Sequence, residues 1–186
     1  MGQSTLGNNL IKNLRVYVKD SPGYLGKLMS TFGEMGANVG DLRLVKRAPR
    51  YNYREVELYV NSEEHMNDIL ARVGELEGIQ IDSVQDAVLE LHRGGKIEMH
   101  SRIEITEPSL LRRIYTPGVA EVCRAIQKNP ESFWDYTYVS RSVAIVTNGT
   151  AILGLGNIGV HAGMPVMEGK SVIFQHLVGI SGVPIL

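Results

Sequence analysis

The chain has 186 residues, with 19 basic and 20 acidic side chains and a formal net charge of -1. This length allows one or two domains, and the balanced charge gives no global field to attract nucleic acid or an anionic membrane. The single cysteine, Cys123, excludes an internal disulfide framework and fits a reducing compartment. We expect Cys123 to be a small buried apolar residue rather than a nucleophile.

Targeting and membrane segments are not apparent. The N-terminus lacks a basic region followed by an apolar core, so it does not have the pattern of a secretory signal. The most apolar stretch, residues 171–186, is interrupted by Gln175, His176 and several glycines, and it is shorter than the roughly 20 residues that a bilayer requires. We therefore expect a soluble cytoplasmic protein with no membrane or nucleic-acid partner.

The first part of the chain, residues 10–91, has the periodicity of a small domain of strands and helices. Leu14, Val16 and Val18 alternate with polar residues, which predicts a strand with one buried face. A turn and an amphipathic helix follow, then two strands around a turn at 49–52, a helix capped by Asn61 or Ser62, and a fourth strand that runs to residue 91 with an irregularity near 82–85. This βαββαβ order predicts the ferredoxin-like α/β (α+β) fold, with both helices on one face of an antiparallel sheet.

The loop after the first strand has a specific pattern, Asp20-x-Pro22-Gly23-x-Leu25, followed by Gly36-Ala37-Asn38. Over about 80 residues this pattern resembles the ACT regulatory domains, a resemblance that implies a free amino acid bound at a subunit interface. Asp20 and Asn38 would then be polar contacts to the effector, and Gly23 would let the backbone approach it. The alternatives are that Pro22-Gly23 is only turn chemistry and that the domain serves for dimerisation.

The second part, residues 92–186, begins after adjacent glycines that predict a domain junction at 92–96. The pattern predicts an extended arm at 97–106, a helix opened by Pro108, a helix ended by Asn129-Pro130, and an aromatic core cluster at 133–136. It also predicts strands at 143–146 and 151–153 joined by a turn at Asn148-Gly149, and the start of a buried strand at 183–186.

Gly154, Gly156 and Gly159 form a GxGxxG pattern after one of these predicted strands. A dinucleotide fingerprint also needs an acidic residue about 20 residues further on, and no carboxylate side chain follows Glu168. The glycines are therefore better explained as a pocket wall shaped by backbone than as a pyrophosphate cradle. A compact dinucleotide-binding protein is the weakest of the alternatives.

Three segments resemble the N-terminal domain of bacterial malic enzymes: residues 115–120 (YTPGVA), 146–159 (VTNGTAILGLGNIG) and 162–170 (AGMPVMEGK). The resemblance implies oxidation of malate at C2 with hydride transfer to a nicotinamide, loss of carbon dioxide, and protonation of the enolate to pyruvate. Lys170 matches the base that removes the hydroxyl proton, and Tyr115 matches the acid that protonates the enolate. Without the resemblance, Lys170 would be an ordinary solvated lysine and Tyr115 a core phenol.

The same resemblance implies that Gly154, Gly156, Asn157 and Gly159 wall the pocket for malate and the nicotinamide. In that family a divalent cation, Mg²⁺ or Mn²⁺, is held by three carboxylates further along the chain, and NAD or NADP is the oxidant. The five histidines here show no zinc-ligand spacing. We therefore expect no metal site in this chain.

Together these features predict the N-terminal part of an NAD(P)-dependent malic enzyme, preceded by an amino-acid-sensing ACT-like domain. We expect a homo-oligomer, because an uncovered sheet edge invites pairing. Residues 92–186 are interpreted as an incomplete malic enzyme domain, so this fragment is expected to be inactive alone. The alternative is a free-standing regulatory or dimerisation protein without catalysis.

Overall fold

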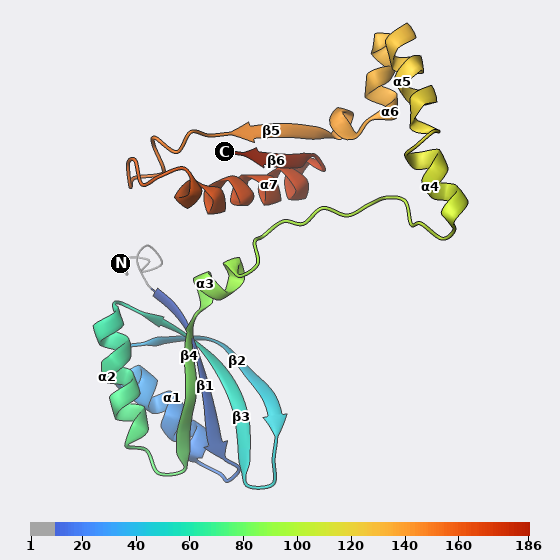
Figure 1. Cartoon of the computed structure of the whole chain (residues 1–186). Helices are drawn as coiled ribbons and strands as arrows, with labels where there is room; N and C mark the ends of the chain where they lie inside the picture. The colour runs from blue at the N-terminus through green and yellow to red at the C-terminus, as the bar shows by residue number, and fades with distance from the viewer. Residues whose placement is uncertain (1–9) are drawn as a thin grey trace. The chain divides into compact units, whose positions relative to one another are not determined.

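The computed structural model describes residues 10–186 and divides between Arg93 and Gly94 into two compact units (Figure 1). Each unit is described in turn. Within residues 10–186, no helix combines the length and the apolarity that crossing a bilayer demands.

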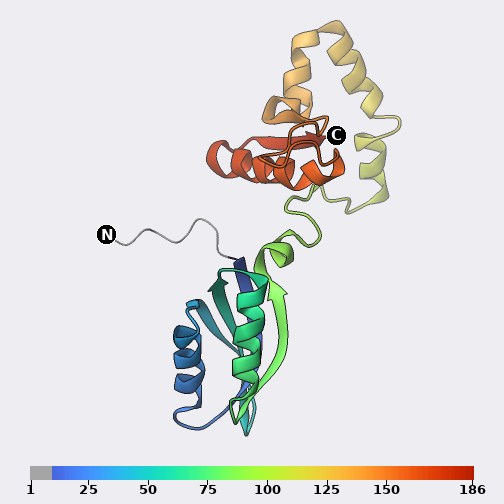
Figure 2. The same ribbon diagram turned by 90° about the vertical axis from the view of Figure 1, so that its left-hand side faces the viewer.

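The first unit is a four-stranded antiparallel sheet in the order β2-β3-β1-β4, with two helices on one face (Figures 1 and 2). Its elements are β1 (Leu10–Lys19), α1 (Tyr24–Glu34), β2 (Asn38–Arg47), β3 (Tyr51–Val60), α2 (Glu63–Gly74), β4 (Ile79–Asp86) and α3 (Ala87–His92). The predicted ferredoxin-like βαββαβ arrangement is thus confirmed.

The core of this unit lies between the helices and the two central strands. Alternate residues of β1 and β3 face α1 and α2, and the most deeply buried side chains come from these four elements: Leu14, Val16, Val18, Leu28, Phe32, Val56, Leu58, Val60, Met66, Ile69 and Val73. Strand β2 is left outside this cover. Leu42 and Leu44 pair with Val56 and Arg54 and so face the helix side, yet they are 39% and 40% exposed.

The predicted irregularity in the fourth strand is confirmed. The register between β1 and β4 shifts where Arg15 pairs with Ser83 and Val16 with Ile81, so Asp82 is the extra residue of a bulge. The bulge lies in an edge strand and interrupts its ladder.

The predicted end of the fourth strand is wrong, because the chain turns into α3 after Asp86. The Asp86 carboxylate accepts hydrogen bonds from the backbone N–H groups of Val88 and Leu89, each at 3.0 Å, and so caps this helix. Leu89 and Leu91, which the alternating pattern assigned to the strand, are 69% and 74% exposed.

A buried lysine ties α3 to the rest of the unit. Lys12 is 6% exposed, and its Nζ lies 2.5 Å from Glu63 Oε1 and 3.1 Å from Asp86 Oδ2. The hydrogen bond that Lys12 donates to Glu63 is the largest of the effects that raise the pKa of Lys12. The Leu89 backbone N–H, assisted by the Lys12 ammonium, lowers the pKa of Asp86. The two charges of Lys12 and Asp86 therefore stabilise each other out of water.

The second unit, residues 94–186, combines short helices with a parallel two-stranded sheet. Its elements are α4 (Pro108–Ile114), α5 (Val119–Lys128), η1 (Pro130–Ser132), α6 (Phe133–Tyr136), η2 (Tyr138–Arg141), β5 (Ser142–Val146), η3 (His161–Gly163), α7 (Met164–Val178) and β6 (Ser181–Ile185). Strands β5 and β6 pair in parallel, and α7 packs on β6. Gly182 permits this packing, since a Cβ there would lie 2.8 Å from Ser171 Cα.

Several predictions for this part are wrong. Residues 151–153 form no strand, whereas residues 97–106, expected as an extended arm, have no helix or strand. Cys123 is exposed, and Trp134 and Tyr136 are 52% and 59% exposed instead of forming a core. The strand at the end of the sequence is only partly buried. For Cys123, Trp134 and Tyr136 the reason is that α5 and α6 bury no residue, so the apolar side chains of these two helices remain exposed.

We predict that Asp86→Asn lowers the free energy of unfolding by about 1–3 kcal/mol at neutral pH, measured by urea unfolding of the chain. Asparagine retains helix-capping ability but removes the negative charge beside Lys12. Because the folded-state pKa of Asp86 is depressed, its contribution is present above the unfolded pKa of about 3.9 and is lost as the pH falls through the folded value. The difference from wild type should therefore shrink below about pH 4.

The matched control is Glu75→Gln, which breaks the exposed pair with Arg72 and should cost less than about 0.5 kcal/mol. Equal destabilisation by both substitutions would show that the buried ion pair is not the source of the effect.

Candidate functional site

Tyr115 lies in a tight connection between α4 and α5. The Gly118 N–H donates to Arg112 O at 2.9 Å, the Val119 N–H donates to Tyr115 O at 2.7 Å, and the Thr116-Pro117 peptide is cis. A Cβ on Gly118 would lie 2.6 Å from Arg113 O, so only glycine fits this connection without a shift of backbone. The Tyr115 side chain is 69% exposed on this rigid loop.

Lys170 lies in α7 and is exposed. The preceding turn of α7 is fastened to the start of the unit, because the Lys96 backbone N–H donates to Glu168 Oε2 at 3.1 Å and Lys96 Nζ donates to Pro165 O at 2.7 Å. The segment at residues 95–96 thus holds the N-terminal half of the helix that carries Lys170.

The structure does not bring Tyr115 and Lys170 together. They belong to different elements, and no hydrogen bond joins their side chains. Helix α7 packs on β6, η3 and β5, whereas α5, which follows Tyr115, packs on η1. Across residues 10–186, no group of three or more histidine, cysteine or acidic side chains could hold a metal ion. A catalytic pocket is therefore not assembled by the described residues alone.

The glycine segment forms an open loop instead of a dinucleotide cradle. The Ile152 N–H donates to Gly156 O and the Leu155 N–H donates to Ile152 O, both at 2.9 Å, which gives a compact turn in place of the predicted strand. Asn157 Oδ1 accepts the Gly159 N–H at 3.3 Å. Helix α7 begins only at Met164, whereas in a dinucleotide fingerprint the helix starts at the glycines.

Two further features of this loop were missed from the sequence. Leu153 has φ 51°, a value that non-glycine residues adopt at a cost and that concentrates at functional sites. A Cβ on Gly149 would lie 2.4 Å from Val160 Cα, so the turn at 147–149 is pressed against the end of the glycine segment. The Asn148-Gly149 pair predicted a turn but not the contact of Gly149 with Val160. Nothing in the sequence predicts the positive φ of Leu153.

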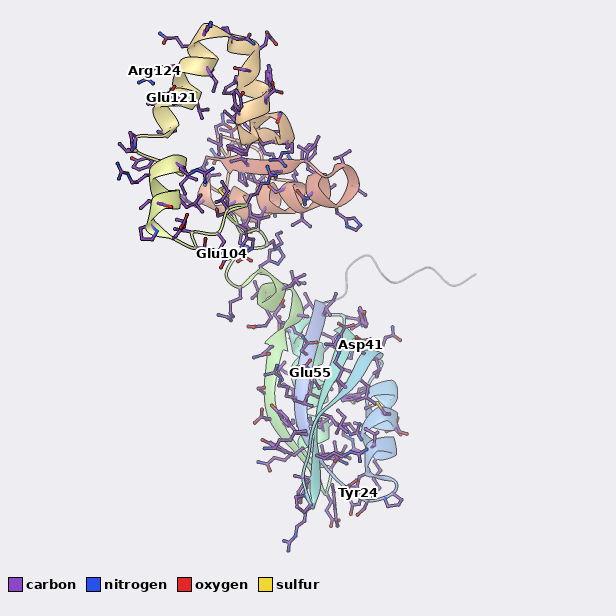
Figure 3. All side chains as sticks on the ribbon, turned by 90° about the vertical axis from the view of Figure 1, so that its right-hand side faces the viewer. Tyr24, Asp41, Glu55, Glu104, Glu121 and Arg124 are labelled. Carbon is purple, nitrogen blue, oxygen red and sulfur yellow. The ribbon has the colours of Figure 1, made fainter. Side chains whose placement is uncertain are left out.

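The effector residues predicted in the first unit lie at two different places. Gly23 has φ 95° and precedes α1, and Asp20 Oδ1 accepts a hydrogen bond of 2.7 Å from Asn52 Nδ2. Asn38 starts β2 and pairs with Tyr59, while Asn52 pairs with Arg47 at the end of β2. Within one copy, Asp20 and Gly23 are therefore at the opposite end of the sheet from Asn38. Figure 3 labels Tyr24, at the start of α1, near the Asp20 end.

Asn52 was not predicted as a site residue. It lies next to a hairpin turn, where asparagine is common for local reasons. Its contact with Asp20 depends on the pairing of β1 with β3, which brings residues 32 positions apart together.

A profile of the malic enzyme N-terminal domain matches residues 94–186, which is half of the chain. The chain belongs to the malic enzyme family. It is 48% identical over 182 residues to NAD-dependent malic enzyme 1 of Bacillus subtilis, covering 97% of this chain and 42% of that protein. It is 34% identical to the NAD-dependent malic enzyme of Geobacillus stearothermophilus, covering 85% of this chain and 33% of that protein.

Among solved structures, the malic enzyme of Pyrococcus horikoshii matches 53% of this chain and 24% of its own, with 42% identity and a TM-score of 0.51. The NAD-dependent malic enzyme of Thermotoga maritima matches 54% of this chain and 29% of its own, with 45% identity and a TM-score of 0.51. This malic enzyme chain thus spans between 24% and 42% of the length of these relatives.

We predict that Gly118→Ala raises the rate of amide hydrogen exchange at residues 115–119 by about tenfold or more, measured by mass spectrometry. The added Cβ would collide with the Arg113 carbonyl and force open the connection that holds Tyr115. Gly154→Ala is the control, because a Cβ there meets nothing within 4 Å. If both variants exchange like wild type, the close approach at Gly118 does not constrain the Tyr115 loop.

Proposed function

We propose that this chain is the N-terminal part of an NAD(P)-dependent, decarboxylating malate dehydrogenase of the cytoplasm, and that its first unit senses a free amino acid. The observation that carries this proposal is that both units, and not only residues 94–186, align with NAD-dependent malic enzyme 1 of Bacillus subtilis, over 97% of the chain. The free Cys123 fits a reducing compartment.

In this proposal, Lys170 removes the proton from the C2 hydroxyl of malate, and Tyr115 delivers a proton to the enolate carbon of the product. The turn at Gly118 positions Tyr115. The hydrogen bonds of Lys96 to Glu168 and Pro165 hold the helix that carries Lys170. Gly154, Gly156, Asn157 and Gly159 form the wall beside these groups.

The described residues do not fit the two groups that the family needs for oxidation and decarboxylation. They offer no cluster of carboxylates for Mg²⁺ or Mn²⁺, and the glycine segment is not placed at a helix start to receive a pyrophosphate. We therefore assign the binding of NAD or NADP and of the cation to the full-length enzyme. Relatives of both cofactor types occur, including the NADP-dependent malic enzyme of Haemophilus influenzae.

A chimaera tests the catalytic roles. This chain replaces the aligned segment of NAD-dependent malic enzyme 1 of Bacillus subtilis, and malate-dependent reduction of NAD is measured. We expect Tyr115→Phe and Lys170→Ala each to lower kcat by about 10²–10⁴. The controls Tyr138→Phe and Lys128→Ala should keep the chimaera's activity, and the 186-residue chain alone should show none. An active Tyr115→Phe chimaera would contradict the role given to the phenol.

We further propose that two copies pair through β2. This strand is exposed along its whole length, and Val39, Leu42 and Leu44 extend the apolar helix-facing row of the sheet. Antiparallel pairing centred between Leu42 and Arg43 sets Asn38 of one copy opposite Arg47 of the other. Because Arg47 pairs with Asn52, which bonds Asp20, this dimer unites the effector residues that one copy keeps apart.

We predict that the chain is a dimer by light scattering and that Val39→Lys produces monomers, because the change puts a charge into the apolar row at the shared edge. Val88→Lys is the matched control, since Val88 is 48% exposed on α3 and far in sequence from that edge. A Val39→Lys protein that stays dimeric would show that copies associate through another surface.

A second candidate function is a free-standing regulatory or dimerisation protein without catalysis. It is favoured by the difference in burial between the two units. The first unit has an extensive core, whereas the buried residues of 94–186, glycines aside, are Ile145, Ile152, Met167 and Ser171. An inactive chimaera together with amino-acid binding by the chain would support this alternative.

A further inference from the structure

We propose that Asn52 and Arg54 bind the ammonium and the carboxylate of a free α-amino acid with an apolar side chain. This inference rests on the amino-acid sensing proposed above and deepens it by naming the groups that hold the effector and the class of effector.

The starting observation is a pair of unsatisfied polar atoms. Among the side chains of residues 10–186, Asn52 Oδ1 and Arg54 Nε are the buried nitrogen and oxygen atoms that have no hydrogen-bond partner. Asn52 is only 8% exposed. A buried acceptor and a buried charged donor without partners are costly, and native proteins rarely keep them unless something else satisfies them.

The two residues lie in one row on β3. Asn52 and Arg54 alternate with Tyr53 and share the helix-facing side with Val56, so their Cα atoms are about 6.7 Å apart along the strand. Asn52 Nδ2 already donates to Asp20 Oδ1 at 2.7 Å, which fixes the orientation of the amide and leaves its oxygen as the free acceptor. The row thus holds a free acceptor and a free cationic donor on the same face of β3.

This arrangement matches the two ends of an amino acid. An ammonium can donate to Asn52 Oδ1 and to the Asp20 carboxylate, and a carboxylate can accept from the Arg54 guanidinium in a charge-assisted bond. The ammonium and carboxylate of an α-amino acid hang from one carbon, and a hydrogen bond of about 2.9 Å at each end lets the ligand span the spacing of the row.

The neighbouring strand indicates the class of side chain. Leu44 pairs with Arg54, and Leu42, which pairs with Val56, follows in the same helix-facing row. Both are about 40% exposed, so an apolar ligand side chain would bury surface against them. Charged partners for a polar side chain are not found at these two positions.

A polar depression at a different place on this unit does not compete for the same role. It is lined by Asn13, Asp41, Arg43, Glu55 and Glu57, and Figure 3 labels two of these residues, Asp41 on β2 and Glu55 on β3. Its charged side chains have partners within the chain: Arg15 pairs with Glu55, Arg43 pairs with Asp41, and the Tyr59 hydroxyl donates to Glu57. It therefore leaves no comparable unsatisfied group.

Isothermal titration of the chain with L-leucine tests the proposal, alongside 4-methylpentanoate, which lacks the ammonium, and 3-methylbutylamine, which lacks the carboxylate. We expect L-leucine to bind and each analogue to bind at least about tenfold more weakly, because each leaves one buried group unpaired. An analogue that binds as tightly as leucine would overturn the two-ended recognition.

Variants locate the site. Arg54→Met and Asn52→Leu should each raise the Kd for L-leucine by about tenfold or more. Arg43→Met, which removes a guanidinium from the polar depression on the same sheet, should leave the Kd unchanged. A melting curve gives a second readout. Without ligand, Arg54→Met should melt at or above the wild-type temperature, because an unpaired polar atom has been removed from a buried row. Asn52→Leu also loses the hydrogen bond to Asp20 and should melt at or below it. Leucine should no longer raise the melting temperature of either variant.

The outcomes separate this inference from the sensing function. If leucine binds Arg54→Met like wild type and Asp20→Ala abolishes binding, sensing stands and the assignment of Asn52 and Arg54 is wrong. If serine or aspartate binds and leucine, valine and phenylalanine do not, sensing stands and the apolar class is overturned. If none of these amino acids binds the wild-type chain, sensing itself fails and this inference fails with it.

Discussion

Side chains of β3 alternate between two faces, and this alternation puts Asn52 and Arg54 in the same row as Val56, Leu58 and Val60. The helices that cover this row remove water from it, which stabilises the apolar members and leaves the polar ones in need of partners. Asn52 donates one hydrogen bond from Nδ2 to Asp20, which lies in the loop that leads to α1. The side chain of Asn52 therefore connects this loop with the helix-facing row of β3.

Residues 94–186 are organised by close backbone contacts more than by side-chain burial. Gly118 against Arg113, Gly149 against Val160 and Gly182 against Ser171 each bring segments nearer than a Cβ would allow. In contrast, apolar side chains of α7 such as Ile173, Leu177 and Val178 remain exposed. The backbone of this unit is therefore held most closely where glycines stand, and apolar surface of α7 is left uncovered within residues 94–186.

Much of the first unit could be predicted because its strands and helices have clean periods of 2 and 3.6 residues. The prediction failed at Leu89 and Leu91, where the apolar alternation continued but the carboxylate of Asp86 capped a helix instead. The predicted burial of Cys123 and Trp134 was wrong, because an apolar side chain is buried only where another element packs against it. Tyr115 and Lys170 could be named from motifs, whereas Asn52 and Arg54 could not, since an unsatisfied atom has no signature in the sequence.

The two edges of the sheet in the first unit differ in a way that limits how copies can assemble. The β4 edge carries the Asp82 bulge and runs into α3. Strand β2 at the other side has register shifts of its own, between Val39 and Leu42 and between Leu44 and Lys46, but all ten of its residues are exposed. A subunit with one usable edge can join a single neighbour, and a two-fold contact then consumes that edge on both members. Growth stops at that point, so the same exposed strand that invites association offers no route to an open-ended filament.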